Sequence, residues 1–125
     1  MPLYSSTQNP RCLDVGQSMQ LFDGTETPAV GLKSAAFARG TQGSTDAGST
    51  FWAQGMPAGM VIDVQEANTN ADADYTSNGG GQLTPSMGSP DSGNSVFTDV
   101  GRSAFYRLYV SAYTSGAMPA AGAQR

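Results

Sequence analysis

Large apolar side chains alternate along residues 103–116, and no glycine or proline interrupts this stretch before Gly116. On an extended strand, one face would carry Tyr106, Leu108, Val110 and Ala112. The opposite face would carry Phe105, Arg107, Tyr109, Ser111 and Tyr113. Neither face is plainly polar, so we expect protein to cover both sides of the strand. Aromatic strand residues of this kind belong more often to a core than to a binding surface, and the stretch therefore predicts a central core strand.

Residues 60–67 predict a second strand, with Met60, Ile62 and Val64 facing the core and Glu66 at its rim. The rest of the chain is interrupted by many of its 16 glycines and 7 prolines, and only 13% of all residues are charged. Such a sequence lacks the strong helix formers and ion pairs that stabilise long helices. The pattern predicts an all-β domain of about six to eight short strands, folded as a β-sandwich or jelly roll.

The sequence divides into three expected parts. These are an extended N-terminal arm over residues 1–12, a β-sandwich domain over residues 13–118 and a small-residue C-terminal tail over residues 119–125. Within the domain we expect a strand pair or broken strand in residues 12–22, a short strand beginning at Phe51, and a strand in residues 95–98 that is a candidate partner for residues 103–116. Residues 28–39 fit either a strand or a short helix, and the glycines at 79–81 predict a turn.

The residue types that most catalytic sites need are scarce in this chain. It has no histidine and a single lysine, Lys33, so a serine or cysteine nucleophile would lack its usual base. The two glutamates, Glu26 and Glu66, stand in no recognisable glycosidase context. Cys12 is the only cysteine, so no disulfide can form within the chain. We therefore predict a protein that is not an enzyme and that uses no cofactor or metal.

Charge and hydropathy narrow the choice of partners. The formal net charge of -4 and the pI near 4.3 argue against nucleic acid, because phosphate binding needs clustered Lys and Arg. No apolar run approaches about 18 residues, so we expect no membrane span. The first residues lack a basic region followed by an apolar one, so we expect no secretory signal, and synthesis in a reducing cytoplasm is the simplest expectation.

The most suggestive polar segment is residues 68–74, in which Asn68, Asn70, Asp72 and Asp74 alternate with other residues. Oxygen ligands at alternate positions resemble the opening of a calcium-binding loop. The glycine and glutamate that an EF-hand needs later in its loop are missing from the matching positions. A turn whose Asn and Asp side chains cap their own backbone is the better interpretation, and whether the loop binds a cation stays open.

Two surfaces are candidates for binding. In the N-terminal arm, Leu3 and Tyr4 are the only sizeable apolar side chains. Ordering such an arm costs on the order of 10–20 kcal/mol of backbone entropy, which a neighbouring chain could offset by accepting the arm as an added strand. The predicted protein-interface residues are Leu3, Tyr4, Arg11, Phe105, Arg107, Tyr109 and Tyr113. The alternative surface is a sugar-stacking platform made of Phe51, Trp52, Tyr106, Tyr109 and Tyr113.

Three segments resemble, in their order, a known group of proteins. Residues 59–68 contain the strand motif Ile62, Asp63, Val64; residues 71–75 form an acidic loop; and residues 105–116 contain Tyr106 and Arg107 followed by Val110. This succession resembles small virion proteins of tailed bacteriophages and covers the C-terminal half of the chain. The resemblance implies a capsid decoration (cement) protein with a β-sandwich or jelly-roll fold.

That resemblance also implies partners and a location. The expected partners are the major capsid protein and further copies of this chain, which would form a homo-oligomer, and the expected location is a virion assembled in the host bacterial cytoplasm. The absence of disulfides fits assembly in a reducing compartment. A carbohydrate-binding β-sandwich module of a phage tail or adhesin is the alternative function.

Overall fold

The computed structural model of this chain describes residues 11–39, 48–85, 95–99 and 103–125. Within these ranges the chain forms nine strands and one short 3-10 turn, and no helix there is long and apolar enough to cross a lipid bilayer. The strands are β1 (Arg11–Leu13), β2 (Ser18–Asp23), β3 (Phe37–Arg39), β4 (Ser49–Gln54), β5 (Val61–Ala67), β6 (Thr76–Leu83), β7 (Ser95–Asp99), β8 (Phe105–Ala112) and β9 (Ala120–Gln124), and the turn is η1 (Asp72–Asp74). The prediction of an all-β fold is confirmed.

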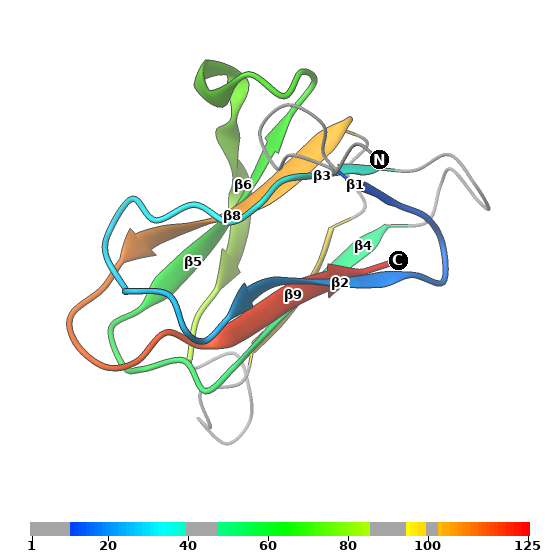
Figure 1. Cartoon of the computed structure of the whole chain (residues 1–125). Coiled ribbons are helices and arrows are strands. Elements are labelled where there is room, and N and C mark those ends of the chain that lie inside the picture. Colours follow the sequence, from blue (N-terminus) through cyan, green and yellow to red (C-terminus); the bar gives the residue numbers. More distant parts are fainter. Residues whose placement is uncertain (1–10, 40–47, 86–94, 100–102) are drawn as a thin grey trace, which may run out of the picture.

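The strands form two sheets that face each other. One sheet has five strands in the order β1-β3-β8-β5-β6, and the other has four strands in the order β2-β9-β4-β7. Neighbouring strands are antiparallel except for the parallel pair β1 and β3. Figure 1 shows β5, β6 and β8 in the upper layer and β2, β9 and β4 in the lower layer. The architecture is a β-sandwich, and the jelly-roll arrangement stays a prediction.

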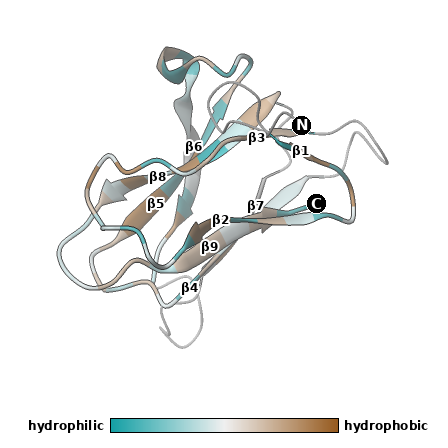
Figure 2. Ribbon diagram, viewed as in Figure 1, coloured by the Kyte–Doolittle hydropathy of each residue, from teal (hydrophilic) through white to brown (hydrophobic). Residues whose placement is uncertain are grey.

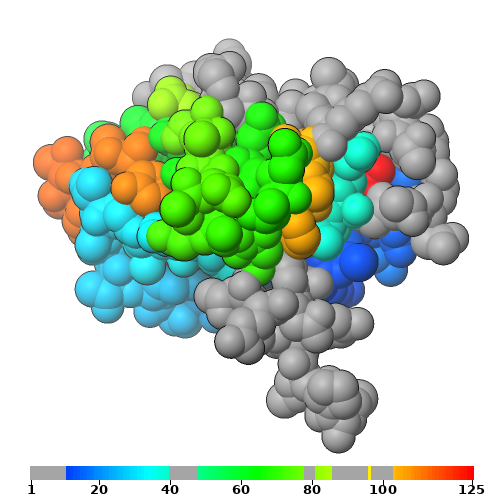
Figure 3. Space-filling model, turned by 90° about the horizontal axis from the view of Figure 1, so that it is seen from above, coloured from blue at the N-terminus to red at the C-terminus, as the bar shows by residue number. Residues whose placement is uncertain are grey.

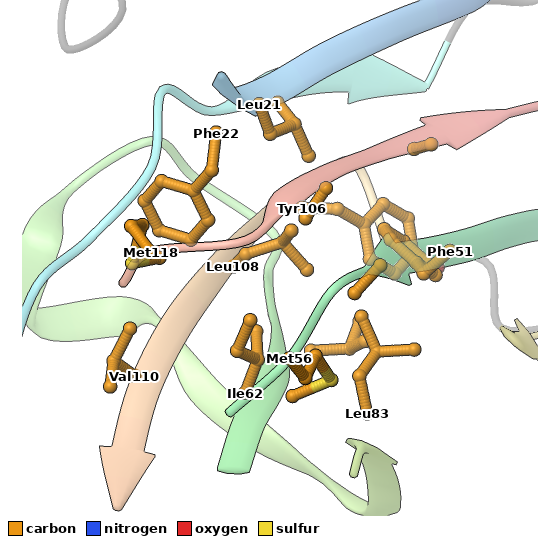
Figure 4. Close-up of a cluster of buried hydrophobic side chains, with 14 of the residues drawn as sticks. Leu21, Phe22, Phe51, Met56, Ile62, Leu83, Tyr106, Leu108, Val110 and Met118 are labelled. Atoms are coloured by element: carbon orange, nitrogen blue, oxygen red, sulfur yellow. The ribbon is translucent and has the colours of Figure 1, made fainter. Parts of the chain in front are cut away.

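The core lies between the two sheets, and alternate residues of β4, β5, β8 and β9 supply much of it. The inward residues of β8, which are Tyr106, Leu108 and Val110, are at most 1% exposed. Met60, Ile62 and Val64 are fully buried, as the alternation in residues 60–67 predicts. Figure 4 shows Ile62, Tyr106, Leu108 and Val110 in one cluster with Phe22 and Phe51 of the facing sheet and with Met118, which precedes β9. Figure 2 shows hydrophobic colouring along β2 and β5.

Three aromatic rings mark the part of the core where the two sheets are joined. Phe37 of β3, Phe51 of β4 and Tyr106 of β8 have ring centroids 5.7–6.0 Å apart. Offset or tilted rings at such distances attract one another beyond the effect of burial alone. Because two of the rings come from the five-stranded sheet and one from the four-stranded sheet, the cluster fixes the position of one sheet relative to the other.

Strand β8 is central, as predicted, and backbone outside the regular strands completes its pairing. Gly31 donates its N–H to the carbonyl of Val110 at 2.8 Å, and Val110 donates its N–H to Leu32 at 2.9 Å. Ser34 donates its N–H to the carbonyl of Leu108 at 2.9 Å. Residues 31–34 therefore run beside β8 before β3 begins at Phe37, so the segment with an ambiguous sequence is extended rather than helical.

Several sequence predictions are wrong in detail. The expected tail over residues 119–125 is instead strand β9, which lies between β2 and β4. The glycines at 79–81 lie inside β6 and do not form a turn. Strand β7 pairs with β4 in the four-stranded sheet, and not with β8. Arg11 begins β1, so the last part of the expected arm belongs to the sheet, while residues 1–10 lie outside the described part of the chain.

Candidate functional site

The outer face of the five-stranded sheet carries polar side chains that are bonded to one another, and several of them are buried. We call this set the polar cluster; it comprises Lys33, Asp63, Gln65, Asp72, Tyr75, Ser77, Gln82, Arg107 and Ser111. Asp63, Gln65 and Arg107 are each no more than 8% exposed, although their strands turn the alternate residues into the core. Figure 3 looks down on this side of the molecule, with green residues of β5, β6 and their connection in the middle of the view.

Asp63 connects three neighbouring strands. Its carboxyl group accepts hydrogen bonds from Ser77 Oγ at 2.9 Å and Gln82 Nε2 at 2.9 Å, both from β6, and from Ser111 Oγ of β8 at 2.8 Å. A carboxyl group needs several donors to compensate for loss of water on burial. The three donors supply this compensation, so Asp63 stabilises the centre of the sheet.

Arg107 connects β8 to the loop between β5 and β6. Its Nε donates to Gln65 Oε1 at 2.7 Å, and its NH1 group donates to Asp72 Oδ1 at 2.7 Å. Its guanidinium carbon lies 4.0 Å from the centroid of the Tyr75 ring, a distance typical of a cation–π contact. Lys33 Nζ donates to the same Asp72 oxygen at 2.9 Å. We call Lys33, Asp72 and Arg107 the Asp72 clasp.

The surroundings of Asp72 and of the neighbouring Tyr75 alter the pKa of each side chain. The hydrogen bond from Lys33, followed by that from Arg107, holds the pKa of Asp72 below its ordinary value. The pKa of Tyr75 is raised, chiefly because burial disfavours the charged phenolate, while the positive charge of Arg107 partly opposes this shift. The Asp72 side chain is 68% exposed, whereas the Arg107 side chain is only 10% exposed. Because the Lys33 side chain is also 41% exposed, the clasp is open to water at Lys33 and Asp72 and closed at Arg107.

The acidic loop at residues 68–74 is held both by backbone hydrogen bonds and by bonds between side chains. Thr69 Oγ1 donates to Asp74 Oδ2, and Tyr75 donates its hydroxyl to Asn70 Oδ1 at 2.6 Å. The residue before η1 is Ala71, whose side chain cannot cap the turn, and its backbone N–H donates to Thr69 Oγ1 at 3.3 Å rather than to Asn or Asp. Among the described residues, no group of three or more His, Cys, Asp or Glu side chains is placed to hold a metal ion.

The predicted interface residues do not form one continuous surface in the structure. Phe105 is half-buried and packs against Ala36, Ala67 and Tyr75. Tyr109 is half-buried beside Gly31, and Tyr113 donates its hydroxyl to the carbonyl of Gly116 at 2.8 Å.

The remaining predicted interface residues lie elsewhere or are enclosed. Arg11 is exposed on β1, while Leu3 and Tyr4 lie outside the described residues. Arg107 is enclosed by the polar cluster, so it offers little surface to a partner in this conformation.

The sugar-stacking platform expected from five aromatic residues does not form. Phe51 and Tyr106 are in the core, at 0% and 1% exposure. Trp52 follows Phe51 on β4 and therefore points out of the four-stranded sheet, whereas Tyr109 points out of the five-stranded sheet. Because the two outward faces lie on opposite sides of the sandwich, these rings cannot bind one sugar together.

Sequence analysis missed the role of Asp63 and Gln65. Their positions in the sequence could have indicated this role, because each is next to a core residue in a largely apolar strand. Side chains at such positions lie on the face of the sheet away from the core, and when they are buried they need hydrogen-bond partners there. The donors come from positions 14 to 48 residues away along the chain, which no local pattern indicates.

The cluster suits a structural role better than a catalytic one. Its central carboxyl and guanidinium groups are bonded to other side chains of the cluster, and no ligand-sized pocket opens in the described part of the molecule. Comparison with protein families, curated proteins and solved structures gave no significant match.

Proposed function

We propose that this chain is a structural virion component: a capsid decoration (cement) protein that binds across capsid subunits and stabilises the shell. The observation that supports the proposal is the spatial grouping of the three segments that carry the resemblance. Strands β5 and β8 are paired over seven positions, from Val61 opposite Ala112 to Ala67 opposite Phe105. The acidic loop is fastened to both strands through Arg107 and its partners. The motif thus corresponds to one structural unit.

A decoration protein needs a rigid body more than a reactive group. The polar cluster provides rigidity by connecting β5, β6, β8 and the loop through side-chain hydrogen bonds, several of them partly or fully buried. Buried networks whose members are satisfied fix a unique arrangement of a domain. Such a body can bury surface at a subunit junction with little loss of internal freedom, because its binding surface is ordered beforehand.

The surface best suited to a capsid contact lies beside β8. Val30 is 60% exposed, and it immediately precedes Gly31, which lies against Tyr109. Tyrosine is enriched among the residues that contribute most to binding at protein interfaces. We place the capsid contact on Val30 and Tyr109, together with Phe105 on the same side of β8 and Tyr113 just beyond the end of that strand.

The test is co-sedimentation of the purified protein with capsids that were assembled without it. Binding is expected, together with a higher temperature of capsid disruption, and analytical ultracentrifugation of the free protein gives its oligomeric state. The double variant Val30→Asp with Tyr109→Ala should weaken capsid binding at least about tenfold, since two interface anchors are lost.

The matched control is Val96→Asp, because Val96 is 59% exposed but lies on β7 of the other sheet. This variant should bind capsids like the unmodified chain. Failure of the unmodified chain to sediment with capsids would overturn the proposed function. Equal loss of binding in both variants would overturn the choice of surface.

A further inference from the structure

The outer face of the four-stranded sheet presents the chain's only tryptophan among uncharged polar residues. On β4, Phe51 and Ala53 point into the core, so Trp52 points outward and is half-buried. On β9, Ala121 and Ala123 point into the core, so Gly122 points outward. We call the outward face of the four strands the tryptophan face. Besides Asp23 at its edge, it comprises Ser18, Gln20, Thr50, Trp52, Gln54, Val96, Ala120, Gly122 and Gln124.

The register of the strands orders this face in rows. Gln20, Gly122, Trp52 and Val96 are paired across the four strands and form the middle row. Ser18, Gln124 and Thr50 form the row on one side, and Ala120 and Gln54 lie in the row on the other side. Because outward residues are two positions apart, successive rows are separated by roughly 7 Å. Amide and hydroxyl groups therefore lie on both sides of the indole ring.

The Trp52 indole packs directly on Gly122. A Cβ atom at position 122 would lie 2.7 Å from Cζ2 and 3.0 Å from Cε2 of Trp52, and closer still to the backbone oxygen of Met19. No real side chain tolerates such contacts, so the indole occupies space that only glycine leaves free. The Trp52 ring therefore lies over β9 and contacts the backbone of Gly122.

The charge of this face selects the kind of ligand. Its outward residues in the described strands include no lysine or arginine, so a phosphate-rich ligand such as nucleic acid finds no counter-charge. One carboxylate, Asp23, lies at the edge opposite Ala120, and it accepts hydrogen bonds from Thr25 Oγ1 at 2.5 Å and Thr25 N–H at 2.9 Å. The hydrogen bonds from Thr25 lower the pKa of Asp23.

A sugar ring has the complementary chemistry. Its C–H faces can pack on an indole, and its hydroxyl groups exchange hydrogen bonds with amide and hydroxyl side chains, which both donate and accept. An extended peptide, in contrast, would be recognised at a sheet edge through backbone hydrogen bonds and not on a sheet face. We propose that the tryptophan face binds a neutral polysaccharide, with the sugar ring on Trp52 and its hydroxyl groups on Gln20, Gln54 and Thr50. This inference does not depend on the proposed capsid function.

The single tryptophan gives a direct readout. We expect titration with laminarin, dextran, hydroxyethyl cellulose or galactomannan to change the Trp52 fluorescence saturably for at least one of the four polymers. The same polymer cast in a native gel should retard the protein. No fluorescence change and no retardation with any of the four would overturn the proposal.

Variants separate the indole from the rest of the fold. Trp52→Ala should reduce retardation at least about tenfold, while Trp52→Phe should keep part of it, because a smaller ring still stacks. Tyr109→Ala, on the opposite side of the sandwich, is the control and should bind the polymer normally. If Trp52→Ala does not fold, the pair Gln20→Ala and Gln54→Ala tests the same surface without touching the ring and should weaken binding severalfold.

Two further outcomes decide against the inference. Unchanged retardation in a folded Trp52→Ala variant would show that the indole does not bind the polymer. Loss of capsid binding in these variants, with no polymer binding by the unmodified chain, would assign the tryptophan face to a protein partner instead.

Discussion

At the scale of single residues, Asp63 shows how a buried polar group stabilises this sheet. Its two oxygens divide the donors: Oδ1 accepts from Gln82 and Ser111, and Oδ2 accepts from Ser77. Asp63→Ala leaves these donors without their acceptor and should lower the free energy of unfolding by about 1–2 kcal/mol, toward the lower part of the usual range because Ser77 and Gln82 can reach water.

Asp63→Asn is the matched control for that change. The amide oxygen can keep Gln82 and Ser111, and the amide nitrogen can donate to Ser77, whose hydroxyl rotates to accept. The expected loss is under about 1 kcal/mol. Urea denaturation at neutral pH measures both variants, and an equal loss in the two would mean that hydrogen bonding at this site contributes little.

Gly122 is a second residue whose identity the structure explains. Gly122→Ala places a methyl group against the backbone oxygen of Met19 and against the Trp52 ring, and should cost about 1–3 kcal/mol of stability. Because the backbone oxygen is the nearer obstacle, the cost should persist in a Trp52→Ala background. Thermal and urea unfolding measure it. Full rescue by Trp52→Ala would show that the ring alone creates the constraint.

Alternation in the sequence predicted the inward residues, but not the partners of the outward ones. Tyr106, Leu108 and Val110 are core residues as expected, because period-two patterning follows directly from strand geometry. Strand periodicity places Arg107 on the face opposite the core, but it does not show that Asp72, 35 positions away, comes near when the loop folds over the sheet. Its burial is therefore a property of the tertiary structure.

At the scale of elements, the Asp72 clasp fastens the loop between β5 and β6 to β8. Asp72→Asn removes the charge that attracts Lys33 and Arg107, and should lower the melting temperature slightly at pH 7. Since the pKa of Asp72 is lower in the folded chain than its ordinary value of 3.8, its contribution is fully present above that value and is lost as the pH falls through the folded pKa.

The difference in melting temperature between the unmodified chain and Asp72→Asn should therefore shrink as the pH falls below about 4. Differential scanning calorimetry from pH 7 to pH 3 measures this trend. A double-mutant cycle with Lys33→Met isolates the exposed ion pair from the rest of the clasp. A difference that grows on acidification would contradict the assignment.

The elements that sequence analysis missed share one physical cause. Strand β9 consists of alanines and a glycine before Gln124, and β6 contains three consecutive glycines, so neither carries a clear alternation of large apolar and polar residues. Both are strands because their neighbours present backbone partners: β2 and β4 on the two sides of β9, and β5 beside β6. Small side chains in β9 also leave room for Phe22 and Phe51 in the core.

At the scale of the whole molecule, β9 closes the sandwich. Strand β9 pairs with β2, from near the start of the described chain, on one side and with β4 on the other. Arg125, which follows β9, forms backbone hydrogen bonds with the turn before β2. Gly16 donates its N–H to the carbonyl of Arg125 at 2.9 Å, and Arg125 donates its N–H to the carbonyl of Gln17 at 3.0 Å. The pairing of distant segments implies that the four-stranded sheet forms only after both are present.

Strand β9 should therefore be indispensable to the fold. Without residues 120–125, β2 and β4 lose their shared neighbour, and the core loses Ala121 and Ala123, which are fully buried.

A finer test is the substitution Ala123→Glu, which forces a carboxylate into the core. The cost is several kcal/mol, comparable with the roughly 5–15 kcal/mol that stabilises a whole domain. Gln124→Glu adds the same group one residue later, where the side chain is exposed, and should be nearly neutral. Circular dichroism during urea unfolding should show a cooperative transition for Gln124→Glu and none for Ala123→Glu or the truncation. Equal stability of the two point variants would mean that β9 does not turn Ala123 into the core.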